Sequence, residues 1–317
     1  MKPFFTIIIV CLNPGEKLAG TLKSVEKQTF HNYEVIIKDG LSKDGSLSYA
    51  YDLQRVWEKE QGCVFGEANA GGMEEGTGKE NGKDIRSIAV ISKKDAGIYD
   101  AMNQAAAEAR GNYLYFLNCG DEFASETVLE EMAGFISGRA GIFYGDIRER
   151  QTGQRVASNP HIDAFACYRN VPCHQACFYS RELLAAHPFE TKYKVRADYE
   201  QFLWCFFEKR ECAQEGRPED GEDADSSSGT GFFYKDMIIA DYEGGGFSET
   251  KENRQISARE HREITGRYMS ARQLFKFRLI MLLTLSHFRT YLAGNERTAG
   301  IYNRMKGMLY GRKKGEV

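Results

Sequence analysis

The sequence lacks the patterns that mark several common classes of protein. Its formal net charge is only −3, from 42 Lys and Arg against 45 Asp and Glu, which argues against a general nucleic-acid-binding protein. The eight cysteines form no CxxC pair, and the closest group, Cys167, Cys173 and Cys177, does not have the spacing of a common zinc site. We therefore expect mostly buried, reduced thiols and a cytoplasmic protein.

Three further patterns are missing. The segment "MKPFFTIIIVCLNPGEKL" has one basic residue before its apolar run and no small-residue cleavage pattern after it, unlike a signal peptide. The turn after this run, "CLNPGEKLAG", contains no GxGxxG pattern, which argues against a dinucleotide-binding dehydrogenase. The apolar core of residues 274–292 is shorter than the roughly 20 residues that a membrane-spanning helix needs.

What the chain does contain is an alternation of apolar and helical segments. Residues 5–12 form the first predicted strand, because Ile and Val dominate a short apolar run. A helix follows, with Asn13 as its N-cap and Pro14 in its first position. Further strands are predicted at 33–39, 87–92, 112–118, 141–147 and 174–180, and further helices at 97–110 and 197–210. This alternation predicts an α/β protein with a mostly parallel central sheet flanked by helices.

Composition divides the chain into regions. Residues 66–84 and 215–230 are rich in small and charged residues, so we expect flexible surface insertions without catalytic residues. Residues 251–317 contain fifteen Lys and Arg against five Asp and Glu, a local net charge of +10. We therefore predict a first domain over 1–250 and a basic, helical C-terminal extension over 251–317 that meets an anionic surface.

Polar side chains follow the first four predicted strands: Asn13, Asp39, Asp95, and Asn118 with Asp121. Ligands bind beyond the carboxyl ends of parallel strands, so we expect these side chains to lie close together at one edge of the sheet. A single Asp in such a position is more often a turn residue or a helix cap. The coincidence of four strand ends is what favours a binding site.

Two of these carboxylates suit the parts of a nucleotide. Asp39 only accepts hydrogen bonds, so it would take the imide N–H of a uracil ring, or else cap the turn that follows it. Asp121 would bind Mg²⁺ or Mn²⁺, which prefer oxygen ligands and would bridge a diphosphate, or else cap a helix beginning near Ser125. Gly120 has no side chain and would let a ligand approach closely.

Five segments occur in the order and approximate spacing of glycosyltransferase family 2: "FTIIIVCLN", "YEVIIKDGLSKDGS", "SKKDAGIYDAMNQA", "GNYLYFLNCGD" and "RADYEQFLW". Over residues 4–250 the chain resembles this family, and most of all its bacterial branch in exopolysaccharide, capsule and lipopolysaccharide synthesis. The resemblance implies a GT-A (Rossmann-like) fold and a divalent cation as cofactor. It also implies inverting transfer of a sugar from a nucleotide-sugar, usually a UDP-sugar, to a hydroxyl of a glycan or lipid-linked acceptor.

The resemblance suggests roles for the residues at the strand ends. Asn13 and Asp39 fall where the family holds the base, and Asp95 falls in the segment that lines the nucleotide and the donor sugar. The family's Asp-x-Asp metal motif lies over residues 118–120, where both aspartates are absent. We therefore expect Asn118 beside the bound cofactor and Asp121 as the metal ligand.

Two residues beyond these strand ends also match the family. Asp198 matches its catalytic base, which would take the proton of the acceptor hydroxyl during inverting transfer. The alternative is an acidic residue favoured by the dipole in the first turn of a helix. His174 falls near the acceptor or the departing phosphate, although a lone His is more often structural.

The C-terminal segment 274–292 mixes apolar residues with Lys276, Arg278 and Arg289. We expect either an interfacial helix, peripheral on the inner face of the membrane and close to a lipid-linked acceptor, or a helix packed on protein. For the whole chain, one alternative stays open: a non-catalytic nucleotide-sugar-binding or partner-binding protein with a degenerate metal motif. Asn118 and Gly120 motivate this alternative because they replace the two expected carboxylates.

Overall fold

The computed structural model describes residues 2–67, 85–209, 231–244 and 250–284. The chain divides into two compact units, 1–262 and 263–317. The predicted insertion at 215–230 lies outside the described residues, as do nearly all of the insertion at 66–84 and the end of segment 274–292.

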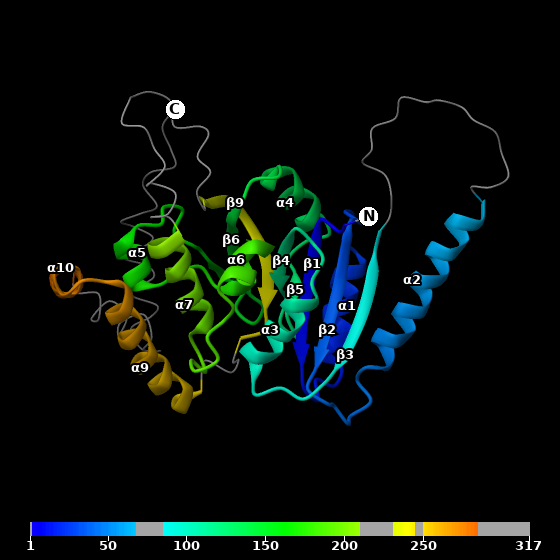
Figure 1. Ribbon diagram of the computed structural model, residues 1–317, viewed down its shortest axis with the longest axis horizontal. Helices are drawn as coiled ribbons and strands as arrows, with labels where there is room; N and C mark the ends of the chain where they lie inside the picture. Colours follow the sequence, from blue (N-terminus) through cyan, green and yellow to red (C-terminus); the bar gives the residue numbers. More distant parts are fainter. Residues whose placement is uncertain (1, 68–84, 210–230, 245–249, 285–317) are drawn as a thin grey trace. The chain divides into compact units, whose positions relative to one another are not determined.

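A nine-stranded sheet is the centre of the first unit (Figure 1). Neighbouring strands follow the order β3 (Ser87–Ser92), β2 (Tyr33–Asp39), β1 (Phe5–Cys11), β4 (Tyr113–Phe116), β8 (Cys177–Ser180), β6 (Gly141–Glu149), β9 (Gly231–Tyr242) and β5 (Glu122–Phe123), while β7 (Arg155–Val156) pairs with β6. The strands from β3 to β4 are parallel, and β6 is parallel to β9, whereas β8 is antiparallel to both of its neighbours. The predicted α/β class is confirmed.

The register of the parallel strands brings their carboxyl ends to one level. Cys11 at the end of β1 lies opposite Asp39 at the end of β2. Asp39 in turn lies opposite Ser92 at the end of β3. The segments that leave these strands therefore start side by side, which is the arrangement that the polar strand ends predicted.

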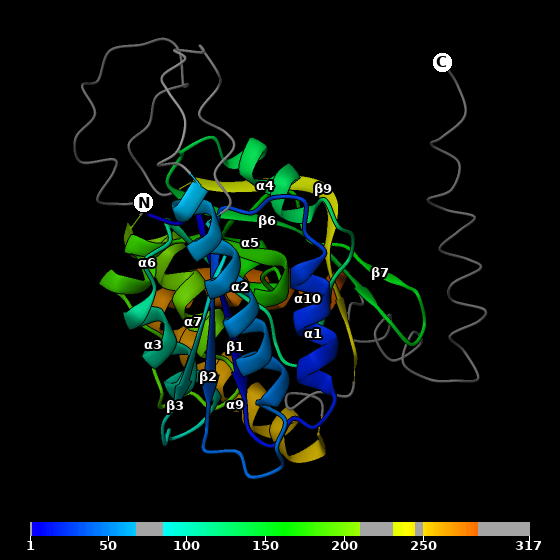
Figure 2. The same ribbon diagram turned by 90° about the vertical axis from the view of Figure 1, so that its right-hand side faces the viewer.

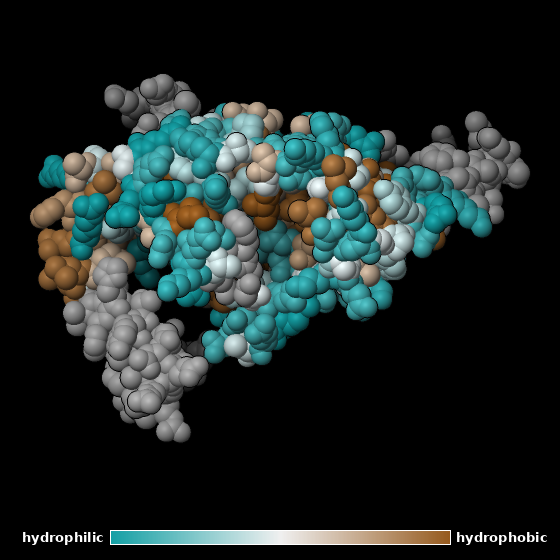
Figure 3. All heavy atoms as spheres, turned by 90° about the horizontal axis from the view of Figure 1, so that it is seen from below, coloured by the Kyte–Doolittle hydropathy of each residue, from teal (hydrophilic) through white to brown (hydrophobic). Residues whose placement is uncertain are grey.

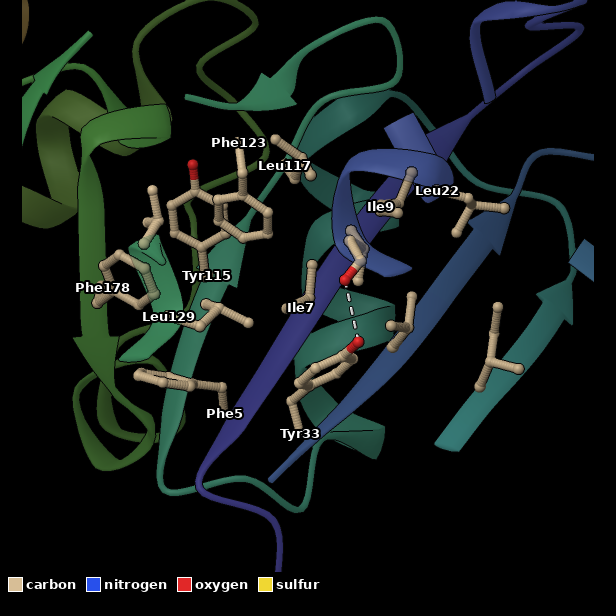
Figure 4. Close-up of a cluster of buried hydrophobic side chains, with 14 of the residues drawn as sticks. Phe5, Ile7, Ile9, Leu22, Tyr33, Tyr115, Leu117, Phe123, Leu129 and Phe178 are labelled. Carbon is tan, nitrogen blue, oxygen red and sulfur yellow. Dashed lines mark hydrogen bonds between the residues drawn. The ribbon is translucent and has the colours of Figure 1, made fainter. Parts of the chain in front are cut away.

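Alternating side chains of the strands build a hydrophobic layer on each face of the sheet. One face carries Phe5, Ile7 and Ile9, which pack with α1 (Lys17–Glu26), α2 (Ser48–Glu67) and α4 (Val128–Ile136) in one buried cluster (Figure 4). Figure 2 shows α2 in front of the parallel strands. Helix α1 packs beside α2. Helix α3 (Ile98–Glu108) packs on β1 and β2, and its buried Tyr99 and Met102 lie outside that cluster. Helices thus flank the sheet, as predicted.

The prediction that Asn13 caps the first helix is wrong. Helix α1 begins at Lys17 after Glu16, whose side chain makes no capping hydrogen bond. Asn13 instead adopts a left-handed backbone conformation with φ of 48°. Its backbone N–H donates to Ser42 Oγ at 2.7 Å, and its Oδ1 accepts the N–H of Lys43 at 2.9 Å. A contact about 30 residues away in the sequence therefore overrides the local capping signal.

Two predicted elements are shorter than expected. The strand predicted at 174–180 begins with a 3₁₀ turn, His174–Ala176, before β8. The helix predicted at 197–210 comprises α7 (Ala197–Trp204) followed by a π-helical segment, Cys205–Lys209. The sequence did not predict three described elements that surround them: α5 (Ala164–Arg169), α6 (Arg181–Ala186) and β9.

The described C-terminal part is helical. Helix α9 (Lys251–Tyr268) crosses the boundary between the two units, and α10 (Ala271–Leu283) follows it. Ser270 and Gln273 form a capping box at the start of α10. None of the described helices is long and apolar enough to cross a membrane. The face seen in Figure 3 is largely hydrophilic, with separate hydrophobic patches.

Candidate active site

The end of β2 and the turn after it form the first part of the site. The Asp39 side chain is fully buried and accepts hydrogen bonds from the backbone N–H groups of Leu41 and Ser42 and from Ser92 Oγ. Burial alone would raise the pKa of Asp39, but these hydrogen bonds outweigh it and lower the pKa. Asp39 therefore stays ionised and caps its turn, which is one of the two roles that the sequence allowed.

A buried ion pair fixes the segment after β3. The fully buried Lys38 places its Nζ 2.9 Å from Asp95 Oδ2, and it also donates to the backbone carbonyls of Asp39 and Lys93. Asp95 Oδ1 accepts the N–H of Gly97, immediately before α3. Asp95 is thus held beside Asp39, because Lys38 ties the ends of β2 and β3 together.

Asp121 lies in the segment between β4 and β5, beside Glu243, which the sequence analysis did not single out. Its Oδ1 accepts the backbone N–H of Glu243 at 3.1 Å, and its Oδ2 accepts Gln175 Nε2 at 3.3 Å. Helix α4 begins at Val128, so the alternative of Asp121 as its cap is wrong. The end of β9 and the turn before β8 hold Asp121 instead.

Gly120 is required by the geometry of this segment. Its φ of 104° is one that L side chains rarely adopt, and a Cβ there would lie 2.9 Å from Glu243 Oε2. That carboxylate pairs with Lys17 Nζ at 2.5 Å. Gly120 therefore leaves room for a Lys17–Glu243 ion pair next to Asp121.

The charge of Asp121 has the surroundings that a cation would complement. The residue is only 6% exposed, and its carboxylate accepts hydrogen bonds from two neutral N–H groups. Burial raises the pKa of Asp121 despite these hydrogen bonds and the more distant His174 and Arg150. A nearly buried carboxylate offers the oxygen ligands that Mg²⁺ or Mn²⁺ prefers. Such an ion would compensate the negative charge of Asp121.

Asn118, His174 and Asp198 form a continuous chain of hydrogen bonds. Asn118 Nδ2 lies 3.0 Å from His174 Nε2, and His174 Nδ1 lies 3.2 Å from Asp198 Oδ2. Tyr99, in α3, places its hydroxyl 2.8 Å from Asp198 Oδ1, which also accepts the N–H of Tyr199. These hydrogen bonds join the segment after β4 and the first turn of α3 to the first turn of α7.

These contacts keep Asp198 ionised. Burial alone would raise the pKa of Asp198, but hydrogen bonds from His174, Tyr99 and the Tyr199 N–H, together with the attraction of His174, lower it. Burial and the nearby Asp198 raise the pKa of Tyr99 well above its usual value, so its hydroxyl stays protonated and donates. Asp198 is 23% exposed at its side chain, so a ligand can reach it.

Glu260, which the sequence analysis missed, supports the segment before Asp198. Its carboxylate accepts the backbone N–H groups of Lys194, Val195 and Arg196 at 2.8, 3.1 and 3.0 Å. Glu260 is 3% exposed and belongs to α9, in the first unit. The approach to α7 is therefore fixed by a residue from the region that we predicted as an extension.

Of the six cysteines whose side chains the structure describes, three are buried and three are half-buried, so the expectation of mostly buried thiols is met only in part. Burial raises the pKa of Cys11 and of Cys119 to about 12 each, so both thiols stay protonated at neutral pH. They line the site as small apolar groups.

A second group of potential metal ligands lies on α7 and in the segment that precedes it. His187, Glu190 and Glu200 place ligand atoms within 4.8 Å of one another. His187 Nε2 lies 2.9 Å from Glu200 Oε2, the His187 ring stacks on Trp204, and Glu190 forms an ion pair with Lys192. These pairings within the protein explain why the three side chains lie together without a metal ion.

The predicted residues thus fall into two linked groups at the carboxyl edge of the sheet. Asn13, Asp39 and Asp95 are joined through Ser42 and Lys38. The second group contains Asn118, Asp121, His174 and Asp198, and Gln175, which directly follows His174 in the sequence, links it to Asp121. Helix α3 connects the groups, because it begins after Asp95 and carries Tyr99 to Asp198.

The comparisons with known proteins agree with this fold. The model of the family "Glycosyl transferase family 2" matches residues 6–75 and 77–192, more than half of the chain. A PGL/p-HBAD biosynthesis glycosyltransferase of Mycobacterium bovis is 30% identical over 207 residues, which cover 64% of this chain and 70% of that protein. The chain belongs to glycosyl transferase family 2, and it is a glycosyltransferase.

Solved structures show the same architecture at low sequence identity. The mannosyltransferase PcManGT from Pyrobaculum calidifontis, in complex with GDP-Man and Mn²⁺, aligns with a TM-score of 0.56 and 14% identity, covering 98% of this chain and 81% of that one. The structure of S. aureus TarS 1-349 in complex with UDP aligns with a TM-score of 0.50 and 16% identity, covering 77% of this chain and 60% of that one. The predicted GT-A fold is confirmed.

Proposed function

We propose that the chain transfers a sugar from a UDP-sugar to a hydroxyl of a glycan or lipid-linked acceptor, with inversion at the anomeric carbon. One observation carries the proposal: an ionised, partly exposed Asp198 shares the carboxyl edge of the sheet with Asp121 and Asp39. The M. bovis relative is named a PGL/p-HBAD biosynthesis glycosyltransferase. In our proposal this chain likewise acts in a biosynthetic pathway, that of a cell-surface polysaccharide.

In this proposal Asp198 is the catalytic base. Its carboxylate takes the proton of the acceptor hydroxyl while that oxygen forms a bond to the anomeric carbon of the donor. The bond from the anomeric carbon to the diphosphate oxygen breaks, and its electrons leave with the nucleoside diphosphate. An ionised Asp198 is ready to accept a proton, and the lowered pKa means that the transfer accompanies the attack, when the hydroxyl becomes acidic.

The remaining residues hold the donor. Asn13 and Asp39 shape the turn that contacts the nucleobase, and Asp95 lies beside the donor sugar. Asn118 offers the donor a buried amide oxygen that has no partner among the described residues. Asp121 would hold Mg²⁺ or Mn²⁺. When bound, the ion supplies positive charge that neutralises the departing diphosphate.

We propose that the basic C-terminal extension meets the inner face of the membrane. Four exposed apolar side chains fall within an arc of roughly 100° on α10 at 3.6 residues per turn: Phe275, Leu279, Leu282 and Leu283. The exposed Lys276 and Arg278 flank this arc. Such an arrangement fits an interfacial helix on anionic lipid, where a lipid-linked acceptor would be found. Packing on another protein surface is the alternative.

The test is release of UDP from a panel of UDP-sugars, with and without glycan and lipid-linked acceptors, by the purified full chain. Asp198→Asn should lower kcat by about 10²- to 10⁴-fold and leave UDP affinity unchanged. Glu200→Gln is the matched control, because it makes the same chemical change in the same helix outside the site. Loss of UDP binding together with turnover would make Asp198 structural. UDP binding by the wild type without any turnover would favour the non-catalytic alternative.

A further inference from the structure

His174 has both ring nitrogens engaged by protein groups. Its Nε2 faces the Asn118 amide nitrogen at 3.0 Å, and its Nδ1 faces Asp198 Oδ2 at 3.2 Å. The two side chains of the His174–Asp198 pair are only 15% and 23% exposed. A ligand would therefore have to break one of these hydrogen bonds to reach a ring nitrogen.

The partners of the ring decide where its proton lies. An ionised carboxylate only accepts hydrogen bonds, so the hydrogen between His174 Nδ1 and Asp198 Oδ2 belongs to Nδ1. Nδ1–H therefore donates to Asp198 Oδ2. The Asn118 amide faces the other ring nitrogen, Nε2, at 3.0 Å and holds the ring in this orientation.

The two oxygens of Asp198 are occupied unequally. Oδ1 accepts hydrogen bonds from the Tyr99 hydroxyl and the Tyr199 N–H, whereas Oδ2 accepts one from His174 Nδ1. An anionic carboxylate oxygen can accept about two hydrogen bonds. Oδ1 is therefore the anchored oxygen, and Oδ2 keeps capacity for a proton.

We propose that His174 is a positioning residue for Asp198: Asn118 holds the orientation of its ring, and its Nδ1–H aims Oδ2 at the acceptor hydroxyl. The role rests on the proposed function, since it assigns the oxygen through which Asp198 would act as base. The sequence suggested a place near the acceptor or the departing phosphate for His174, and in this proposal the residue acts on the acceptor through Asp198. The groups that face the ring are Asp198 from α7, and Asn118 and, at longer range, Asp121 from the segment after β4.

Two substitutions separate the ring nitrogens. His174→Asn places an amide N–H near the position of Nδ1 and keeps a donor to Asp198. His174→Gln places its amide near the position of Nε2 and loses that donor. We expect His174→Gln to lower kcat on the order of 10- to 100-fold, as for a lost hydrogen bond to a charged group, and His174→Asn to lower it less than about 5-fold.

Two further readouts distinguish positioning from a structural role. The acid limb of the pH–rate profile should move to higher pH in His174→Gln, because a contact that lowers the pKa of Asp198 is lost, and stay near the wild-type position in His174→Asn. UDP affinity should be unchanged in both variants. Equal loss of kcat in the two variants, or a loss of UDP affinity in both, would overturn the proposal.

A measurement without turnover tests the hydrogen-bond chain itself. The ¹⁵N chemical shifts of the His174 ring in the full chain should show a protonated Nδ1. An unprotonated Nδ1 would refute the positioning role. If the wild type turns over no UDP-sugar, the proposed function fails, and the state of Nδ1 still decides whether His174 donates to Asp198.

Discussion

Replacing Glu260 by alanine should destabilise the first unit and disturb the start of α7. The Glu260 carboxylate is the acceptor for three consecutive backbone N–H groups, those of residues 194–196. Alanine removes this acceptor and leaves a space that is 3% exposed in the native structure. The effect reaches Asp198, because these residues lead directly into its helix.

The magnitude follows from which donors water can reach. Lys194 is exposed, so water can bond its N–H after the substitution, whereas Val195 is buried and Arg196 is half-buried. Leaving a buried donor without a partner costs about 1–3 kcal/mol. Two such donors give a loss of about 2–6 kcal/mol in the free energy of unfolding. For a unit of this size that corresponds to a fall of roughly 4–24 °C in Tm.

The assay is thermal and guanidinium unfolding of the full chain, followed by circular dichroism. Arg259→Ala is the matched control, since it truncates an exposed neighbour in the same helix and should stay within about 0.5 kcal/mol of the wild type. Glu260→Gln should fall between the two, because it keeps one oxygen acceptor. An unchanged Tm in Glu260→Ala would refute the view that α9 fixes the approach to Asp198.

Three other substitutions test the rest of the site. Lys38→Met should lower the free energy of unfolding by about 2–4 kcal/mol, because it leaves Asp95 without its buried counter-charge; an unchanged denaturation midpoint would contradict this. Gly120→Ala should cost about 1–3 kcal/mol through its φ of 104° and weaken Mn²⁺ binding, and wild-type values in calorimetry and unfolding would argue against it. Asp121→Asn should raise Tm at neutral pH. The pKa of Asp121 is raised in the fold above 3.8, so the cost of its ionisation to folding grows as pH rises from about 3.8 and is complete above the higher pKa of the folded state. The gain should vanish near pH 3, and a gain independent of pH would contradict burial of the charge.

The sequence predicted the part of the fold that local patterns determine. The first four strands and their polar ends were found because short β-branched runs stop at Asp or Asn, and Asp39 and Asp121 lie at the predicted edge. The wrong cap at Asn13 shows the limit of this reasoning. The capping signal is local, but hydrogen bonds to residues 42 and 43 hold Asn13 in a turn before the helix, where it cannot cap it.

The supports of the site could not be predicted in the same way. Glu243 donates its backbone N–H to Asp121 across 122 residues, and Glu260 accepts from Val195 across 65 residues. A backbone N–H carries no side-chain signature, and an isolated Glu in a charged helix looks like a solvated residue. Strand β9, which positions Glu243, reads as a mixed segment with polar Lys235 and Asp236 at its centre. Only the folded chain brings these residues together.

Calorimetric titration of the full chain with UDP and GDP, each with and without Mn²⁺, tests the central claim most directly. We predict that UDP binds, that Mn²⁺ strengthens the binding, and that Asp121→Ala removes the effect of Mn²⁺. GDP binding in place of UDP would redirect the search for the donor to GDP-sugars. Absence of UDP binding under every condition would contradict the assignment of a UDP-sugar transferase.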